Sequence, residues 1–160
     1  MILSLPDLTD AVADARARGR TIVLANGCFD VLHVGHVRYL QGARREGDVL
    51  VVAVNDDEAV RALKGEGRPI LPAEERAEVV AALEGVDHVT IFPGTTVGSV
   101  IDAIQPDVHC KGTDYTVETV PERALVAAYG GRTVIVGDPK THATRDLIGE
   151  IVRAIRPPCA

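Results

Sequence analysis

Two histidines stand close together early in the chain, within the segment NGCFDVLHVGH at residues 26–36. His33 and His36 lie on either side of Gly35, and a stretch of helical periodicity begins near His36. The N-terminus of a helix carries unpaired N–H groups and partial positive charge, which suit a phosphate. Imidazoles placed there, protonated or as neutral donors, stabilise charge on a phosphoryl group. These residues alone leave a second interpretation open, in which the histidines cap the helix or bind a metal.

A second candidate group is basic and rich in glycine. Lys64 and Arg68 lie in the segment LKGEGRPI at residues 63–70, which we interpret as a glycine-flanked basic loop. A mobile lysine on such a loop can close over a triphosphate and neutralise charge as it develops. The alternative is a solvated basic surface. Arg76 follows within the next predicted helix, and we favour a structural role for it.

The elements that must position these residues alternate along the chain. Short apolar runs rich in β-branched residues predict strands at residues 21–26, 49–55, 88–92, 108–111 and 133–136. Helical periodicity predicts a first helix capped by Ser4 and further helices at residues 36–46, 73–83, 96–104, 121–129 and 144–155. The alternation predicts an open parallel α/β sheet, and the continuously apolar strands indicate that both of its faces are covered. Ligands of such sheets bind outside the carboxyl ends of the strands.

Polar residues follow the later strands too. Lys111 ends a buried strand, where a lysine is unusual unless an anion meets it. We expect His109 and Cys110, in the same strand, to be structural. Thr144 and Arg145 begin the last predicted helix, and two interpretations stay open for them. Either both meet a phosphate, or Thr144 only caps the helix and Arg145 is solvated.

Composition narrows the class of protein. The chain has 160 residues, enough for one domain, and 17 Lys and Arg against 23 Asp and Glu give a net charge of −6. This acidity, with 3% aromatic residues and no Trp, argues against a general nucleic-acid binder. Three cysteines without close spacing indicate a reduced, cytoplasmic protein rather than a disulfide or zinc scaffold. We find no membrane span and no signal peptide, and we expect a single domain over residues 1–160 with its core at about 21–155.

The motif Asn-Gly-Cys-Phe-Asp followed by His-x-Gly-His, directly after a first strand, resembles the signature of the HIGH-motif nucleotidyltransferase superfamily. Within it, AVNDDEAVRALKGEGRPILPAEERAEVVAALEGVD at residues 53–87 resembles ADP-heptose synthases in particular. The resemblance covers residues 21–155. It implies a Rossmann-like, five-stranded parallel sheet of order 3-2-1-4-5 with helices on both faces.

The resemblance also implies roles for single residues. It implies catalytic roles for His33, His36 and Lys64. Nucleotide binding is implied for Asn26, Gly27, Cys28, Phe29, Asp30, Gly35, Lys111, Asp114, Thr144 and Arg145, and substrate binding for Asn55, Arg68, Gly112 and Thr113. The chain departs from the family pattern at Thr113, where glycine is usual, and at Ala143 and Arg145, where Ser or Thr is usual.

The implied reaction transfers AMP from ATP to a sugar 1-phosphate, which we expect to be D-glycero-β-D-manno-heptose 1-phosphate, and releases pyrophosphate. Mg²⁺ would arrive with ATP rather than in a protein metal site. The resemblance implies a homodimer, with the sugar kinase and phosphatase steps carried out by separate proteins. An alternative is a cytidylyltransferase for glycerol 3-phosphate or another alcohol phosphate. Two other classes are a nucleotide-binding module without catalysis and a flavodoxin-like redox or signalling domain, which leaves the two histidines unexplained.

Overall fold

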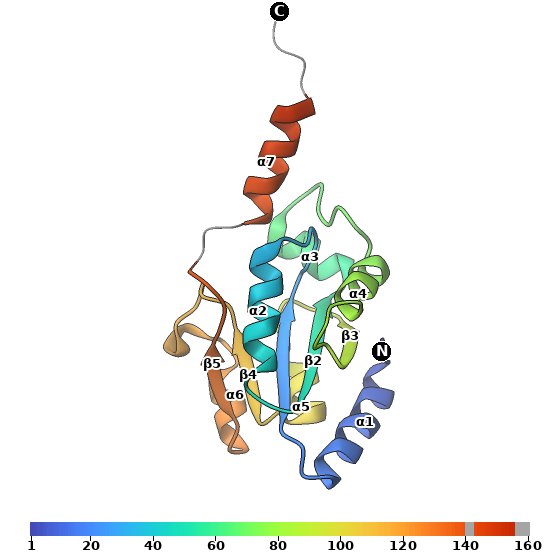
Figure 1. Cartoon of the computed structure of the whole chain (residues 1–160), viewed down its shortest axis with the longest axis vertical. Coiled ribbons are helices and arrows are strands. Elements are labelled where there is room, and N and C mark those ends of the chain that lie inside the picture. The colour runs from blue at the N-terminus through green and yellow to red at the C-terminus, as the bar shows by residue number, and fades with distance from the viewer. Residues whose placement is uncertain (140–142, 156–160) are drawn as a thin grey trace, which may run out of the picture.

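The computed structural model describes residues 1–139 and 143–155, and its centre is a five-stranded sheet (Figure 1). The strands are β1 (Ile22–Gly27), β2 (Val49–Asn55), β3 (His88–Phe92), β4 (Val108–Lys111) and β5 (Arg132–Ile135). They lie in the order β3-β2-β1-β4-β5, and every neighbouring pair is parallel. The order 3-2-1-4-5 and the parallel sheet expected from the sequence are therefore confirmed.

Helices cover both faces of the sheet, as predicted. On one face pack α1 (Leu5–Ala17), α5 (Gly98–Ile104) and α6 (Arg123–Ala128), and on the other pack α2 (Val34–Arg44) and α4 (Ala73–Ala81). All seven residues of β2 are buried because the strand is enclosed on both sides. In α1, the Ser4 hydroxyl caps the helix by accepting the N–H of Asp7 at 3.3 Å, as the sequence indicated.

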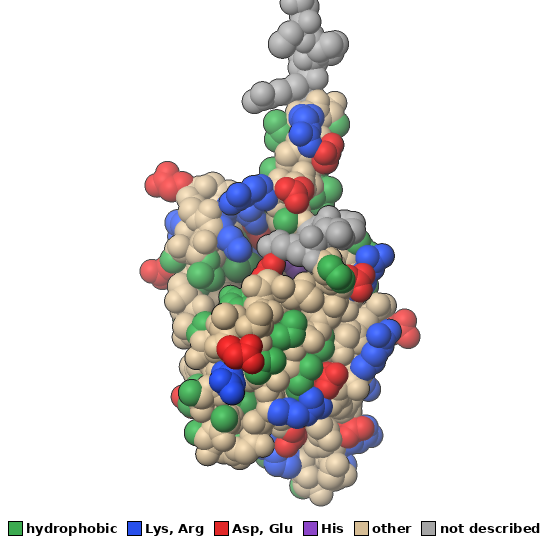
Figure 2. Space-filling model, turned by 90° about the vertical axis from the view of Figure 1, so that its left-hand side faces the viewer, with side chains coloured by type: hydrophobic (Ala, Val, Ile, Leu, Met, Phe, Trp, Pro, Cys, Tyr) green, Lys and Arg blue, Asp and Glu red, His purple; other side chains and the backbone are tan. Residues whose placement is uncertain are grey.

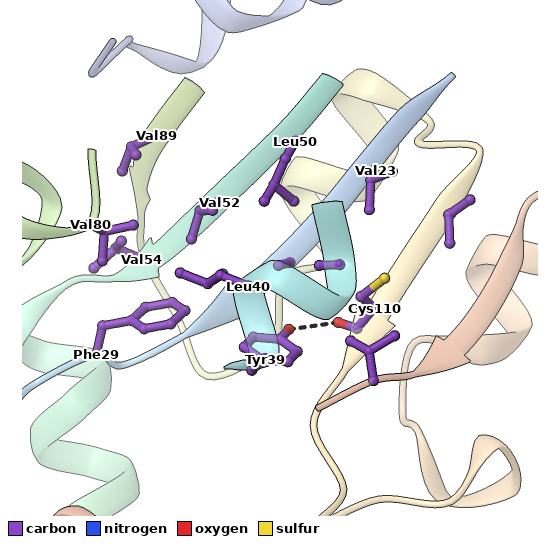
Figure 3. Close-up of a cluster of buried hydrophobic side chains, with 14 of the residues drawn as sticks. Val23, Phe29, Tyr39, Leu40, Leu50, Val52, Val54, Val80, Val89 and Cys110 are labelled. Atoms are coloured by element: carbon purple, nitrogen blue, oxygen red, sulfur yellow. Dashed lines mark hydrogen bonds between the residues drawn. The ribbon is translucent and has the colours of Figure 1, made fainter. Parts of the chain in front are cut away.

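The core on the α2 side reaches the carboxyl end of β1 (Figure 3). Val23, Leu50 and Val52 from the strands belong to the same cluster as Tyr39 and Leu40 of α2. The Tyr39 hydroxyl donates a hydrogen bond of 2.8 Å to the carbonyl of Cys110 in β4. This bond ties α2 to the strand on the far side of β1, across the point where the strand order reverses.

Three elements differ from the expectation. A helix, α3 (Asp57–Lys64), follows β2 and is capped by Asp56, whose carboxylate accepts the N–H of Ala59 at 2.7 Å. Lys64 therefore ends a helix and is not on the predicted loop. A short 3-10 helix (Val117–Thr119) precedes α6. Helix α2 begins at Val34 rather than at His36, because His33 is its cap.

The last helix, α7 (Thr144–Ile155), stands apart from the layers around the sheet (Figure 1). It has no buried residue, and Ile151, Val152 and Ile155 are among the exposed apolar side chains. Within the part of the chain that the structure describes, no helix is both long enough and apolar enough to cross a bilayer.

Candidate functional site

The two histidines form the entrance to α2. His33 caps the helix, and its Nδ1 accepts the N–H of Gly35 at 3.1 Å. His36 reaches back, so that its Nδ1 accepts the N–H of His33 at 3.4 Å. The rings stack with centroids 4.0 Å apart. The helix-capping interpretation is thus confirmed. In addition, a neutral imidazole whose Nδ1 accepts a hydrogen bond carries its proton on Nε2, where it is a donor.

His36 is held in the neutral form. Burial, together with the charges of His33 and Lys64, lowers its pKa to about 4. The ring of Phe29 lies beside it, with centroids 5.3 Å apart. The effect of Lys64 on His36, and also on Cys28, shows that the end of α3 lies within electrostatic reach of α2's entrance.

The first loop, residues 28–33, is fixed by its own side chains. Phe29 adopts a left-handed backbone with φ 48° while its ring is buried in the core. Asp30 is buried too, pairs with Arg68, and accepts the N–H groups of Ile70 and Leu71 at 2.7 and 3.0 Å. The side chains of Phe29 and Asp30, both predicted to bind nucleotide, are therefore engaged within the chain.

Gly27 has a packing reason to be glycine. A Cβ at this position would lie 3.2 Å from the Phe29 ring, tighter than ordinary van der Waals contact. The glycine thus lets the first loop fold its aromatic ring back beneath the end of β1.

Arg76 joins three segments from inside the protein. Its residue exposure is 1%, and its guanidinium donates to the carbonyls of Cys28, Asn55 and Leu71 at 2.5, 2.8 and 2.9 Å. A fourth bond, of 2.7 Å, goes to the carboxylate of Asp57. The structural role favoured from the sequence agrees with these contacts.

A buried polar cluster lies between β1 and β4. The amide oxygen of Asn26 lies 3.1 Å from both His109 Nε2 and Lys111 Nζ. Lys111 also pairs with Glu122 at 3.4 Å, and Glu122 accepts the N–H of Val97. We expected an anion beside the buried Lys111, and the structure shows that the Glu122 carboxylate of the same chain is that anion. Burial lowers the pKa of Lys111, and burial and the Lys111 charge lower that of His109 to about 4.

The remaining predicted residues divide between two places. Thr144 donates its hydroxyl to the Val31 carbonyl at 3.3 Å, which places the start of α7 beside the first loop. Arg145 is exposed. After β4, Thr113 and Asp114 are exposed, and the Thr113 hydroxyl donates to the Asp138 carbonyl at 2.7 Å. The residue that replaces the family's glycine therefore links the exits of β4 and β5.

A hollow of about 450 Å³ lies on the β2 side, and we call it the β2 hollow. Its lining includes Asp57, Arg61, Arg68, Pro69, Ile70 and Pro72. Asn55, predicted to bind substrate, is instead buried nearby and donates to the Gly94 carbonyl at 3.0 Å. In Figure 2, Lys and Arg side chains gather beside the foot of α7, and histidine surface shows in the recess next to them.

The structure thus brings the two histidines, Lys64, the first loop and Thr144 toward one edge of the sheet. Glu122, Tyr39 and Asp57 were not among the residues expected to act in the site. One signal was available for Glu122, because a buried lysine requires an anion and Glu122 opens the helix that follows Pro121.

In residues 1–139 and 143–155, no three His, Cys, Asp or Glu side chains converge to hold a metal ion.

The sheet order, together with a histidine pair at the helix entrance after β1, defines a class of nucleotide-handling domain. A family model described as cytidylyltransferase-like matches residues 24–154, and the chain belongs to that family. The bifunctional protein HldE of Alkalilimnicola ehrlichii is 54% identical over 135 residues, which cover 84% of this chain and 28% of that protein. HldE of Syntrophotalea carbinolica is 46% identical over 145 residues, covering 91% of this chain and 30% of that protein.

This chain thus spans less than a third of the length of either relative. Among solved structures, a lipopolysaccharide core biosynthesis protein from Thermoplasma volcanium GSS1 superposes with a TM-score of 0.67. The two are 26% identical, and the match covers 76% of this chain and all of that one.

Proposed function

We propose that this domain transfers AMP from ATP to the phosphate of a sugar 1-phosphate, and that the sugar is D-glycero-β-D-manno-heptose. The carrying observation is the stacked pair of His33 and His36 at the entrance of α2, directly after β1. The bifunctional HldE relatives and the pattern at residues 53–87 support the heptose phosphate as acceptor.

The chemistry needs alignment more than a base. An oxygen of the acceptor phosphate, already ionised at neutral pH, attacks the α-phosphorus of ATP, and the bond from that phosphorus to the β-phosphate oxygen breaks. Pyrophosphate carries away the released charge. The N–H groups at the start of α2, the Nε2–H donors of His33 and His36, and Lys64 supply positive potential for charge on the phosphates.

Two further parts belong to the proposal. Mg²⁺ enters as a component of the ATP substrate, because a triphosphate is its ordinary partner. The domain forms a homodimer, and the exposed apolar side chains of α7 are surface that self-association would cover.

The test is release of pyrophosphate with Mg²⁺, measured for ATP and CTP in parallel. Each nucleotide is paired with heptose 1β-phosphate, another sugar 1-phosphate and glycerol 3-phosphate. We expect release with ATP and the heptose phosphate, and His36→Ala should lower turnover by about 10²–10³-fold with an unchanged far-UV spectrum.

Release of pyrophosphate with CTP and glycerol 3-phosphate instead would show that the domain is a cytidylyltransferase. Binding of ATP without release for any acceptor would favour the non-catalytic module. An unchanged rate in His36→Ala would overturn the assignment of the site.

A further inference from the structure

The guanidinium of Arg76 is the meeting point of segments that the sequence keeps far apart. Its three carbonyl partners belong to the first loop (Cys28), the end of β2 (Asn55) and the loop before α4 (Leu71). A buried charge is stable only when it is paired and hydrogen-bonded, and here Asp57 supplies the opposite charge. Only the planar fork of arginine can reach four acceptors in these directions.

Of the segments that Arg76 contacts, α3 and the loop before α4 supply residues that line the β2 hollow. Its lining residues include Asp57, Gly67, Pro69, Ile70 and Pro72. Arg61 and Arg68 add two guanidinium groups, of which that of Arg68 also pairs with Asp30. Its volume suits a small ligand, and arginines suit a phosphate. Lys111 and Thr144, which were predicted to bind the nucleotide, are not among the four hydrogen-bond partners of Arg76.

We infer that Arg76, held by Asp57, is a positioning residue that fixes the β2 hollow as the binding place of the anionic sugar phosphate. This inference rests on the proposed function. Arg76 sets the first loop and the loop before α4 in one arrangement, and Asp57 holds the guanidinium from the solvent side, where its side chain is 39% exposed.

Replacing Asp57 distinguishes a direct effect on the acceptor from an effect through Arg76, because the two change the KM in opposite directions. The Asp57 carboxylate lines the hollow and repels an anionic acceptor. If this repulsion is its only effect, removing it should lower the KM for the acceptor. If Asp57 acts through Arg76, removing it should raise that KM instead. Glu58 is the matched control, because it is an exposed acid in the same first turn of α3.

The experiment compares wild type, Asp57→Ala, Glu58→Ala and Arg76→Lys by pyrophosphate release, with each substrate varied in turn. For Asp57→Ala we expect the KM for the sugar phosphate to rise about tenfold and that for ATP to change by less than about twofold. Glu58→Ala should match wild type, and Arg76→Lys should show the same split as Asp57→Ala, or a larger one.

Hydrogen exchange supplies a readout that does not depend on activity. The amides of residues 28–31 and of Ile70 and Leu71 should exchange faster in Asp57→Ala than in Glu58→Ala, while those of β5 stay unchanged. A lower KM for the acceptor, equal rises for both substrates, or unchanged exchange would overturn the inference. An inactive wild type with the exchange difference intact would instead count against the proposed function.

Discussion

His36 shows how one residue acquires its chemical state from its surroundings. In water an imidazole is half protonated near pH 6.5, but burial and the neighbouring positive charges hold this ring neutral near pH 7. Its Nδ1 is occupied by the N–H of His33, which leaves Nε2–H as the donor. A bound phosphate would oppose the effect of burial on the pKa, so the ring can strengthen its hydrogen bond as charge develops on the phosphate.

The same pKa predicts how stability depends on pH. Between pH 6.5 and 4 the unfolded chain binds a proton at His36 that the folded chain does not, and His109, with a pKa of about 4, behaves alike. The free energy of unfolding should therefore fall as the pH drops through this window and be unaffected by these groups above it. Urea unfolding at pH 7.5 and 5.0 measures the difference.

In His36→Gln the fall between those two pH values should be smaller, because one of the titrating histidines is gone. Equal falls in the variant and the wild type would show that His36 is not held neutral by the folded state.

Residue types alone could not reveal these states. The sequence indicated that His33 and His36 lie at a helix start, and it gave their donor role as one of two options. Which nitrogen bears the proton depends on two backbone N–H groups that only the turn of the loop brings into reach. Phe29 and Asp30 were predicted to touch nucleotide, yet both side chains are buried, because a left-handed residue turns the first loop back onto the core.

At the scale of elements, the entrance of α2 is held over the sheet by Tyr39. Its hydroxyl bonds the Cys110 carbonyl, and its ring stacks on Phe29 with centroids 6.5 Å apart (Figure 3). Burial raises the pKa of this hydroxyl, so it remains a donor. A helix whose N-terminus must meet a phosphate is thus fixed to the strands on which its site depends.

Replacing this hydroxyl should therefore affect both stability and turnover. Tyr39→Phe should lower the free energy of unfolding by about 1 kcal/mol, with an unchanged urea m-value, and lower turnover by a few fold. Tyr129→Phe is the matched control, because its hydroxyl bonds the Pro106 carbonyl at 3.1 Å at the amino-terminal end of the sheet. That variant should lose stability without losing turnover, and equal turnover in both would contradict the link.

The strands were predictable because apolar β-branched runs and the alternation with helices carry that information in the sequence, whereas their order was implied by the family resemblance. Helix α3 was not predicted, since it has only eight residues and its start depends on the Asp56 cap. The partners of Lys111 and Arg76 were equally hidden. Glu122 and Asp57 meet them only after the strands have assembled.

At the scale of the whole molecule, the net negative charge opposes the binding of an anionic ligand. A chain of net charge −6 repels a triphosphate at long range, so binding depends on positive groups concentrated at one edge of the sheet. Carboxylates near this edge are paired with basic side chains. Asp30, Asp57 and Glu122 each form an ion pair with a basic residue of the same region. The carboxyl edge can therefore bind an anion although the molecule as a whole is acidic.

If ATP binds the folded domain there, it must stabilise the whole molecule, because the unfolded chain has no assembled site. At one hundred times its Kd, MgATP should add about 2.7 kcal/mol to the free energy of unfolding, which for a domain of this size raises Tm by about 5–10 °C. Thermal unfolding at fixed protein concentration measures this shift. MgCTP at the same concentration should give a smaller one, and a chelator should remove most of the ATP effect if Mg²⁺ enters with the nucleotide. A larger shift with CTP would reassign the base, and no shift with either would mean that this edge of the sheet does not bind a nucleoside triphosphate.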